Sequence, residues 1–218
     1  MILKIINLSF SYKSKKILDK TTTYFRDNKI YGLIGKNGIG KTTLFKLINN
    51  NHKYEGFILL NNRVINNEEI FMIDSSPSLP DFLTGKEYLL YLSKLKGISI
   101  DLDELCRKVN LDINDLDKLM IDYSHGMKNK IEFISIMILN PKIILLDEPL
   151  TNLDIISQEE IKNILNELKK KHIIIISTHL IDLAFDLCDD IYIMNNYKIK
   201  RIAKDKKIII DKINESYN

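Results

Sequence analysis

The residue types best suited to chemistry gather in one glycine-rich segment near the N-terminus. The segment comprises Gly35, Lys36, Asn37, Gly38, Ile39, Gly40, Lys41, Thr42 and Thr43. Its glycines allow successive backbone N–H groups to curve around phosphate oxygens, and a helix starting at its end would favour negative charge. Lys41 would then reach the β and γ phosphates of a nucleotide, and the Thr42 hydroxyl would bind Mg²⁺. The pattern predicts a phosphate-binding loop (P-loop) for a nucleoside triphosphate.

Two adjacent carboxylates follow a continuously apolar run at residues 143–146. Such a run is typical of a central parallel strand, and open α/β sheets bind their ligands where these strands end. Asp147 is therefore the expected partner of Mg²⁺, and Glu148 is expected to orient or deprotonate an attacking water molecule. Together with the P-loop, this acidic pair predicts hydrolysis of the bound nucleotide.

One histidine, His179, follows another predicted strand, residues 173–177, with only Thr178 between them. A lone histidine is usually a bystander, but a side chain at the end of a central strand faces the same crevice as the P-loop. We expect His179 to hydrogen-bond the γ-phosphate or the attacking water.

The elements that position these residues can be predicted from apolar periodicity. Short apolar runs predict strands at residues 2–10, 30–34, 143–146, 173–177 and 191–194. Helical spacing predicts helices at residues 42–49, 87–96, 126–139, 155–170 and 180–187. Strands that alternate with helices indicate an α/β sheet. The N-terminal part and the tail at 197–210 alternate more regularly, which favours antiparallel strands near an edge.

Between about residues 77 and 139 the pattern is almost entirely helical, which indicates an inserted helical subdomain. The expected fold class is therefore α/β. It is a P-loop NTPase with a mainly parallel core sheet, an N-terminal antiparallel β subdomain and this helical insertion. The length of 218 residues suits one principal domain.

Composition excludes several other classes. The net charge of +3 is too small to indicate nucleic-acid binding. A basic stretch between residues 198 and 207 is expected to be a solvated edge without a role. Cys106 and Cys188 form no metal-binding pair and are expected to be small buried residues. The sequence shows neither a secretion signal nor an apolar run of about 18 residues, so we expect a cytoplasmic protein.

A short motif upstream of the acidic strand resembles the signature motif of ATP-binding cassette (ABC) ATPases, usually written Leu-Ser-Gly-Gly-Gln. It consists of Tyr123, Ser124, His125, Gly126, Met127 and Lys128. The Ser124 hydroxyl and the amides of the following helix would form an anion site. In the family, this site closes on the γ-phosphate held by a second cassette. The resemblance thus implies ATP as the nucleotide and a dimer with an identical or a different cassette, with Ser124 and Gly126 contacting the nucleotide.

The resemblance extends over nearly the whole chain, as a single ABC ATPase domain at residues 1–218. Tyr12 matches the aromatic residue that stacks on adenine, Leu153 and Asp154 resemble the D-loop at the dimer interface, and His179 matches the switch histidine. Residues 83–89 look like the entry to the helical subdomain in bacterial ABC exporters that serve a separate transmembrane permease. The implied function is ATP-driven export of a peptide, drug or lipid, peripherally at the inner face of the plasma membrane.

The chain departs from the family pattern at several positions. Ser75 stands near the place of the family's glutamine between core and helical subdomain, which puts contact with Mg²⁺ or water from that loop in doubt. His125 and Met127 replace a glycine and the glutamine of the signature. Tyr197 occupies a place where a glycine turn is common, and the sequence suggests no function for it.

Two other readings remain open. A soluble ABC ATPase could act on ribosomes or DNA, but such members generally carry two fused cassettes or a long coiled-coil insertion, and neither is present. A GTPase would need a guanine-reading Asn-Lys-x-Asp element. The nearest match runs from Asn129 to Glu132, inside the signature helix, and is expected to be the polar face of that helix.

Overall fold

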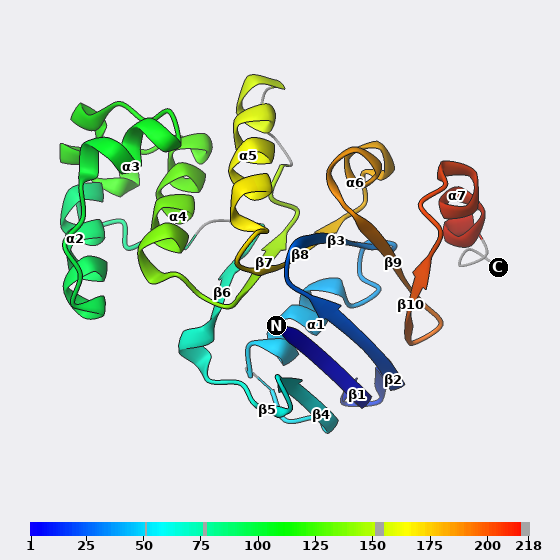
Figure 1. Ribbon diagram of the computed structural model, residues 1–218. Coiled ribbons are helices and arrows are strands. Elements are labelled where there is room, and N and C mark those ends of the chain that lie inside the picture. Colours follow the sequence, from blue (N-terminus) through cyan, green and yellow to red (C-terminus); the bar gives the residue numbers. More distant parts are fainter. Residues whose placement is uncertain (51, 76–77, 151–154, 215–218) are drawn as a thin grey trace.

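The computed structural model describes residues 1–50, 52–75, 78–150 and 155–214, and it contains two β-sheets with helices around them (Figure 1). The larger sheet has the strand order β10-β9-β3-β8-β7-β6. Its strands are β3 (Lys29–Ile34), β6 (Ile70–Ile73), β7 (Ile143–Asp147), β8 (Ile173–Thr178), β9 (Asp190–Asn195) and β10 (Lys198–Ile202). All neighbours pair in parallel except β9 and β10, so the predicted mainly parallel core sheet is confirmed.

The central strands are buried on both faces. On β8, Ile174 and Ile176 belong to one hydrophobic cluster, whereas Ile173 and Ile175 belong to another on the opposite face. This alternation follows from the two-residue period of a strand. It explains why the run at 173–176 is continuously apolar in the sequence.

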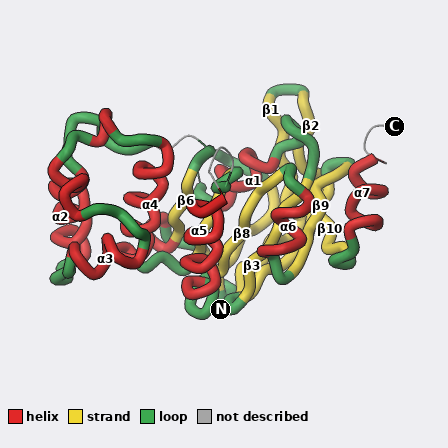
Figure 2. Tube along the Cα trace, turned by 90° about the horizontal axis from the view of Figure 1, so that it is seen from above, coloured by secondary structure: helices red, strands yellow, loops and turns green. Residues whose placement is uncertain are grey.

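The helices α1 (Lys41–Ile48), α5 (Ile155–Leu168) and α6 (Ile181–Leu187) cover these two faces (Figure 2). Leu44 and Phe45 of α1 pack in one cluster, and Leu165 of α5 and Ala184 of α6 pack in the other. The glycine-rich loop therefore leads from the central strand β3 directly into a helix on one face of the sheet.

The smaller sheet is antiparallel, with the order β2-β1-β4-β5. It comprises β1 (Ile2–Tyr12), β2 (Lys15–Arg26), β4 (Glu55–Leu60) and β5 (Arg63–Val64). The antiparallel N-terminal sheet is confirmed, but the expectation of an edge position is wrong for β1, which pairs with β2 on one side and β4 on the other. Leu3 and Ile5 of β1 pack against the same cluster as α1, which makes this sheet the cover of that helix.

Residues 78–139 form a separate group of helices beside the edge strand β6 (Figures 1 and 2). They contain α2 (Gly85–Lys96), α3 (Leu102–Lys108) and α4 (His125–Leu139), with 3-10 turns at Ile113–Asp117 and Met120–Asp122. α2 starts at a capping box in which Thr84 and Glu87 satisfy each other's backbone N–H groups. It ends at Gly97 with φ of 65°.

The tail differs from its prediction as antiparallel strands up to residue 210. β10 does pair antiparallel at the sheet edge, but it ends at Ile202, and α7 (Lys206–Asn214) follows. The Asp205 carboxylate accepts hydrogen bonds from the N–H groups of Lys207 and Ile208, which stabilises a helix start. Ile209 is fully buried, so this short apolar run is one face of a helix.

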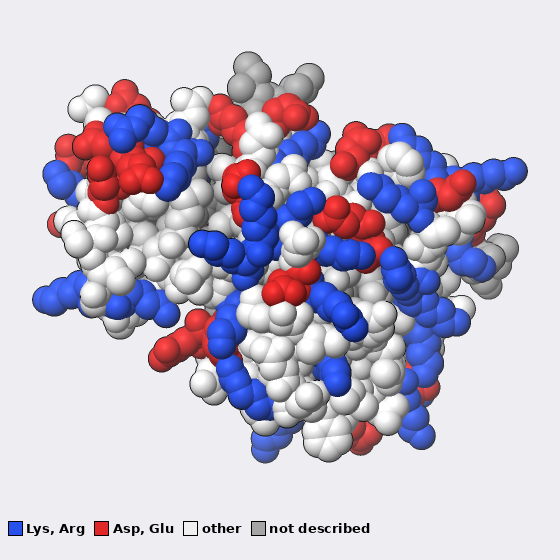
Figure 3. Space-filling model, in the orientation of Figure 1, with Lys and Arg blue, Asp and Glu red and all other residues white. Residues whose placement is uncertain are grey.

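The basic residues of this tail also have structural partners. Arg201 pairs with Asp190, Lys206 Nζ lies 2.7 Å from Asp182 Oδ1, and Lys198 donates to the Asp19 carbonyl. On the face shown in Figure 3, Lys and Arg are interspersed with Asp and Glu. Part of the predicted solvated edge therefore joins neighbouring strands and helices.

Three further positions bear on the predictions. Tyr197 has φ of 62°, in the left-handed region, which is the physical reason why glycine is common at this turn. Cys106 and Cys188 are both buried, as predicted. Across the described ranges, no helix combines the length and apolarity needed to cross a bilayer.

Candidate functional site

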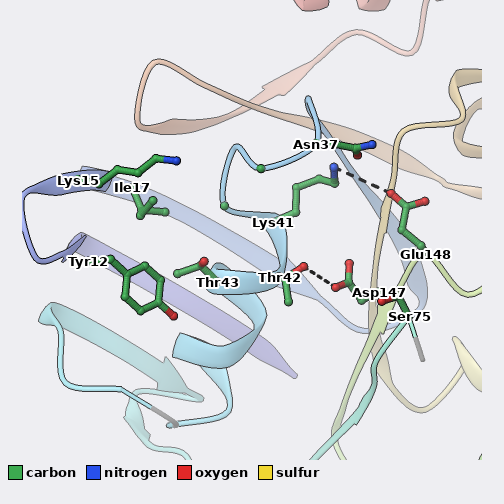
Figure 4. A pocket seen from close by; sticks show the side chains of 12 residues that line it. Tyr12, Lys15, Ile17, Asn37, Lys41, Thr42, Thr43, Ser75, Asp147 and Glu148 are labelled. Atoms are coloured by element: carbon green, nitrogen blue, oxygen red, sulfur yellow. Dashed lines mark hydrogen bonds and ion pairs between the residues drawn. The ribbon is translucent and has the colours of Figure 1, made fainter. Parts of the chain in front are cut away.

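A cleft of about 430 Å³ lies at the carboxyl edge of the larger sheet. Its lining comprises Tyr12, Lys15, Ile17, Asn37, Gly38, Gly40, Lys41, Thr42, Thr43, Ser75, Asp147 and Glu148. Figure 4 shows Tyr12 and Lys15 on one side, Asp147 and Glu148 on the other, and the P-loop between them. β3 and β7 both pair in parallel with β8, so their carboxyl ends bring the loop and the acidic pair to one place.

The P-loop adopts a conformation that requires glycine. Gly40 has φ of 117°, and a Cβ there would lie 2.4 Å from Ile17 Cγ2. Ile39 N–H donates to the Lys36 carbonyl at 3.2 Å, which closes a tight turn just before α1. The loop therefore brings backbone N–H groups and the start of a helix to the cleft, an arrangement that favours phosphate.

Lys41 is held in place by the loop itself. Its Nζ donates to the carbonyls of Gly35 at 2.8 Å and Lys36 at 3.3 Å, and lies 3.9 Å from Glu148 Oε1. The side chain is only 7% exposed, and this burial lowers the pKa of the ammonium. Nearby Glu148 and Asp147 act in the opposite direction. A phosphate group in the loop would supply the anionic partner that offsets the cost of burying this charge.

Asp147 is the centre of a hydrogen-bond network. Thr42 Oγ1 donates to its Oδ2 at 2.5 Å, and Ser177 Oγ donates to its Oδ1. A hydroxyl and a carboxylate oxygen are the hard donors that Mg²⁺ prefers. In the described residues no three His, Cys, Asp or Glu side chains gather as a metal site. An ion here would therefore be held by Thr42, Asp147, water and the phosphates, and these donors fit Mg²⁺.

Glu148 has an unusual backbone. Its φ is 53°, a left-handed conformation that costs of order 1–3 kcal/mol for a residue with a Cβ. Its N–H donates to the Ser177 carbonyl at 3.1 Å, which fixes the residue against β8. Its Oε1 lies 3.0 Å from His179 Nδ1. The structure therefore joins the predicted base, which lines the cleft, to the predicted switch histidine, which is not among the residues that line it.

The opposite end of the cleft is aromatic. Tyr12 is 41% exposed, and its hydroxyl lies 2.9 Å from His52 Nε2. Its ring meets the rings of Phe10 and His52 edge to face. Because Tyr12 lines the cleft and is partly exposed, its ring is accessible for stacking on a flat base. Ser75, at the predicted place of the family's glutamine, also lines the cleft.

The structure does not bring the signature residues to this cleft. Ser124 caps α4, and its Oγ accepts from Met127 N–H at 3.2 Å, as a helix start requires. Neither Ser124 nor Gly126 is among the residues that line the cleft. Leu153 and Asp154, the predicted D-loop, lie outside the described residues.

Sequence reasoning missed Ser177, Lys15, Ile17 and His52 as residues of this site. Ser177 is the first polar residue after four isoleucines, which is a weak signal for a strand end at the ligand edge. Lys15 and Ile17 come from β2. His52 lies 40 residues after Tyr12 in the sequence and reaches it only in the folded chain. Nothing in their local sequence indicates a site.

The fold and this cleft define a P-loop ATPase. Comparison with known proteins gives its family: the ABC transporter family model matches residues 18–151. The chain therefore belongs to the ABC transporter family, whose ATP-binding subunits couple ATP hydrolysis to transport.

Three relatives show how far the similarity extends. A Bacillus subtilis protein named "Probable peptide export ATP-binding protein YydI" is 31% identical over 218 residues, covering 98% of this chain and 100% of the relative. The "Lantibiotic transport ATP-binding protein SrtF" of Streptococcus pyogenes is 31% identical, covering 91% of this chain and 89% of the relative. A solved structure titled "Structure of ATP binding subunit of ABC transporter" superposes with a TM-score of 0.86 at 26% identity, covering 100% and 98% of the two chains.

Proposed function

We propose that this chain binds and hydrolyses Mg-ATP to drive export of a peptide, drug or lipid through a separate permease. The observation that carries the proposal is the meeting of Lys41, the Thr42–Asp147 pair and Glu148 in one cleft. The names of the two similar proteins above, one for peptide export and one for lantibiotic transport, favour a peptide among the possible cargoes.

Within the cleft each residue has a separate task. Lys41 and the P-loop amides would bind and orient the phosphates, and Thr42 and Asp147 would hold Mg²⁺, which would neutralise charge on the phosphates. Glu148 accepts a proton from the water that attacks the γ-phosphate in line. His179 holds the Glu148 carboxylate through the 3.0 Å contact, and its imidazole would also hydrogen-bond the γ-phosphate. Tyr12 stacks on adenine.

The location of the signature motif supports a dimer. Because Ser124 and Gly126 lie outside the cleft of their own chain, their hydroxyl and amides can serve a nucleotide bound to a second cassette, identical or different. α4 has 15 residues, long enough to favour an anion at its N-terminus. Closure over two nucleotides and reopening after hydrolysis would move the helical segment.

That helical segment also carries apolar surface that suits a membrane partner. Its exposed large apolar side chains include Phe82 at 79%, Leu95 at 65% and Ile121 at 60%. Phe82 and Ile121 lie on segments joined by backbone hydrogen bonds, so their exposed side chains offer neighbouring apolar surface for a partner. We therefore propose that the permease docks on the helices beside β6 and that the chain sits peripherally at the inner face of the plasma membrane.

Purification from gently solubilised native membranes tests this proposal. The tagged wild-type chain should bring down one polytopic membrane protein in fixed stoichiometry, and a tagged unrelated cytosolic protein should not. Recovery with ribosomes or DNA, or without any partner, would overturn the transporter assignment and leave an ATPase with another task.

A further inference from the structure

A carboxylate without a partner is buried inside the helical segment. Glu132, on α4, is only 6% exposed, and its Oε2 is fully enclosed and accepts no hydrogen bond. Among the described residues it is the one buried side-chain oxygen or nitrogen in that condition. The sequence-based expectation that Glu132 lies on a polar face of the helix is therefore wrong. Asn129, also assigned to that face, is buried as well.

The surroundings of Glu132 add negative charge instead of compensating it. Burial and the nearby Asp74 carboxylate raise the pKa of Glu132 to about 8. On the α2 side, the Tyr88 hydroxyl is hydrogen-bonded to the Ser135 side chain. Burial raises the pKa of this hydroxyl, and the negative charge of Glu132 raises it further. Among the described residues neither Glu132 nor Asp74 has an ion pair with Lys or Arg.

The basic residues nearest along α4 already have partners. Lys128, one turn before Glu132, lies 3.1 Å from Asp81. Lys130 donates to the Asn110 carbonyl at 2.7 Å and lies 3.3 Å from Glu160. The chain itself therefore offers no free cation of α4 to this acidic pair.

We propose that Asp74 and Glu132 form a receiving site for one Lys or Arg side chain from the cytosolic part of the permease. This inference rests on the proposed function and names the chemistry of the contact that it requires. An isolated buried carboxylate is costly, whereas a carboxylate that pairs with an incoming cation becomes favourable.

The position of Asp74 and Glu132 would allow a contact there to influence the nucleotide site. Asp74 follows the last residue of β6 and directly precedes Ser75, which lines the ATP cleft. Ser75 is too short to replace the family's glutamine. A permease cation paired with Asp74 would instead fix the backbone beside Ser75. The ion pair of the same cation with Glu132 would link this backbone to α4, the helix that follows the signature motif.

An apolar surface next to the pair fits the same partner. Residues 81–83 and 120–121 are joined by hydrogen bonds from Met120 N–H to the Leu83 carbonyl and from Ile121 N–H to the Asp81 carbonyl. This unit presents exposed Phe82 and Ile121 and is tied to α4 by Lys128, on the same helix face as Glu132. The partner surface expected here is apolar with one central basic residue, a combination common at interface hot spots.

The proton balance of the contact is simple. In the isolated chain the Glu132 carboxyl keeps its proton near neutral pH, because its pKa is raised. When the cation arrives, the carboxyl loses this proton to water and the ion pair forms. No other group needs to change.

The test uses the permease complex obtained with the wild-type chain. Glu132→Gln and Asp74→Asn remove one charge each at nearly unchanged shape, and Asp103→Asn, an acid on α3, is the matched control. We expect at least about tenfold weaker permease binding for the first two variants, since breaking a buried charge pair is costly. The control should bind as the wild type does, and ATP binding by the isolated chains should stay unchanged in all three.

A charge reversal sharpens the result. Asp74→Lys, at an exposed position, should abolish binding, and one Lys→Glu or Arg→Glu change in a cytosolic loop of the permease should restore it. Equal binding of wild type, Glu132→Gln and Asp74→Asn would overturn this inference while leaving the proposed function intact. Failure of the wild-type chain to bring down any permease would instead overturn the proposed function itself.

Discussion

Buried carboxylates have opposite environments in the ATP cleft and at the junction between β6 and α4, which is the site of Asp74 and Glu132. In the cleft, both oxygens of Asp147 accept hydrogen bonds, from Thr42 and Ser177. At the junction, Glu132 Oε2 has no partner and another acid lies near it. A carboxylate whose oxygens both accept hydrogen bonds is held rigidly in place. A buried carboxylate without a hydrogen-bond partner lowers the stability of the folded chain, and a partner that binds it can remove this penalty. The comparison indicates that Asp147 is held in place within one chain, and it supports our proposals that a second cassette completes the cleft and that the junction binds a protein.

The largest effect is expected in the cleft at Glu148. Glu148→Gln should lower steady-state ATP hydrolysis by at least about 100-fold, because the proton acceptor is lost. ATP binding should be retained, since the P-loop is untouched. Turnover by a phosphate-release assay and binding by calorimetry measure the two quantities. Undiminished turnover would remove Glu148 from this role.

Lys41→Ala should weaken ATP binding itself by about 10- to 100-fold, the range for hydrogen bonds to charged groups. Lys46→Ala is the matched control, because Lys46 lies further along α1 and is not among the residues that line the cleft. Calorimetric titration with ATP measures both affinities. If the Lys41 variant bound ATP as tightly as the control, the phosphate cradle would be misassigned.

Glu132→Gln should make the isolated chain more stable, in contrast to its effect on permease binding. The folded carboxyl keeps its proton from its ordinary pKa of 4.5 up to about 8, whereas the unfolded carboxyl ionises near 4.5. The Glu132 contribution to stability is therefore present below pH 4.5 and is lost as the pH rises towards 8.

The free energy of unfolding, from urea titrations at several pH values, should show this. The advantage of the Gln variant over wild type should widen from about pH 4.5 to about pH 8. A constant difference over that range would mean that Glu132 is ionised and compensated in the folded chain, contrary to the comparison.

Ser177→Ala should lower the free energy of unfolding by about 1–3 kcal/mol, because a buried carboxylate oxygen loses its donor. It should also raise the Mg²⁺ concentration needed for half-maximal hydrolysis, since Asp147 is less well positioned. Ser135→Ala, another fully buried serine hydroxyl but on α4, should leave the Mg²⁺ requirement unchanged. An equal shift in both variants would make the effect of Ser177 one of general stability.

The smallest effect is expected at the aromatic end of the cleft. Tyr12→Ala should weaken ATP binding by up to about tenfold, the range for aromatic stacking, and Tyr12→Phe should bind nearly as wild type. Competition with a fluorescent ATP analogue is sensitive enough for this difference. If the Phe variant lost as much affinity as the Ala variant, the hydroxyl and His52 would matter more than the ring.

Much of this account could be predicted from the sequence because its signals are local. Gly38 and Gly40 mark the loop, and the isoleucines before Asp147 mark a buried strand that ends at the ligand edge. Ser177 and Lys15 could not be assigned in this way, because their approach to the cleft depends on strand order and on packing between the two sheets.

Two failures have clear physical causes. α4 is covered by α2 on one side and by the core on another, so its polar residues are buried and Glu132 could not be placed from helical periodicity. The apolar run 208–210 is short enough to fit either a strand or a helix. The Asp205 carboxylate stabilises the helix, because it accepts hydrogen bonds from the first free backbone N–H groups.

The most direct test of the central claim is the rate of ATP hydrolysis by the purified chain with and without its permease in lipid nanodiscs. If the chain powers that permease, the permease should raise turnover several-fold, and Glu148→Gln should abolish turnover in both states. An unchanged rate on adding the permease that co-purified with the chain would contradict the claim that hydrolysis in this cleft drives transport.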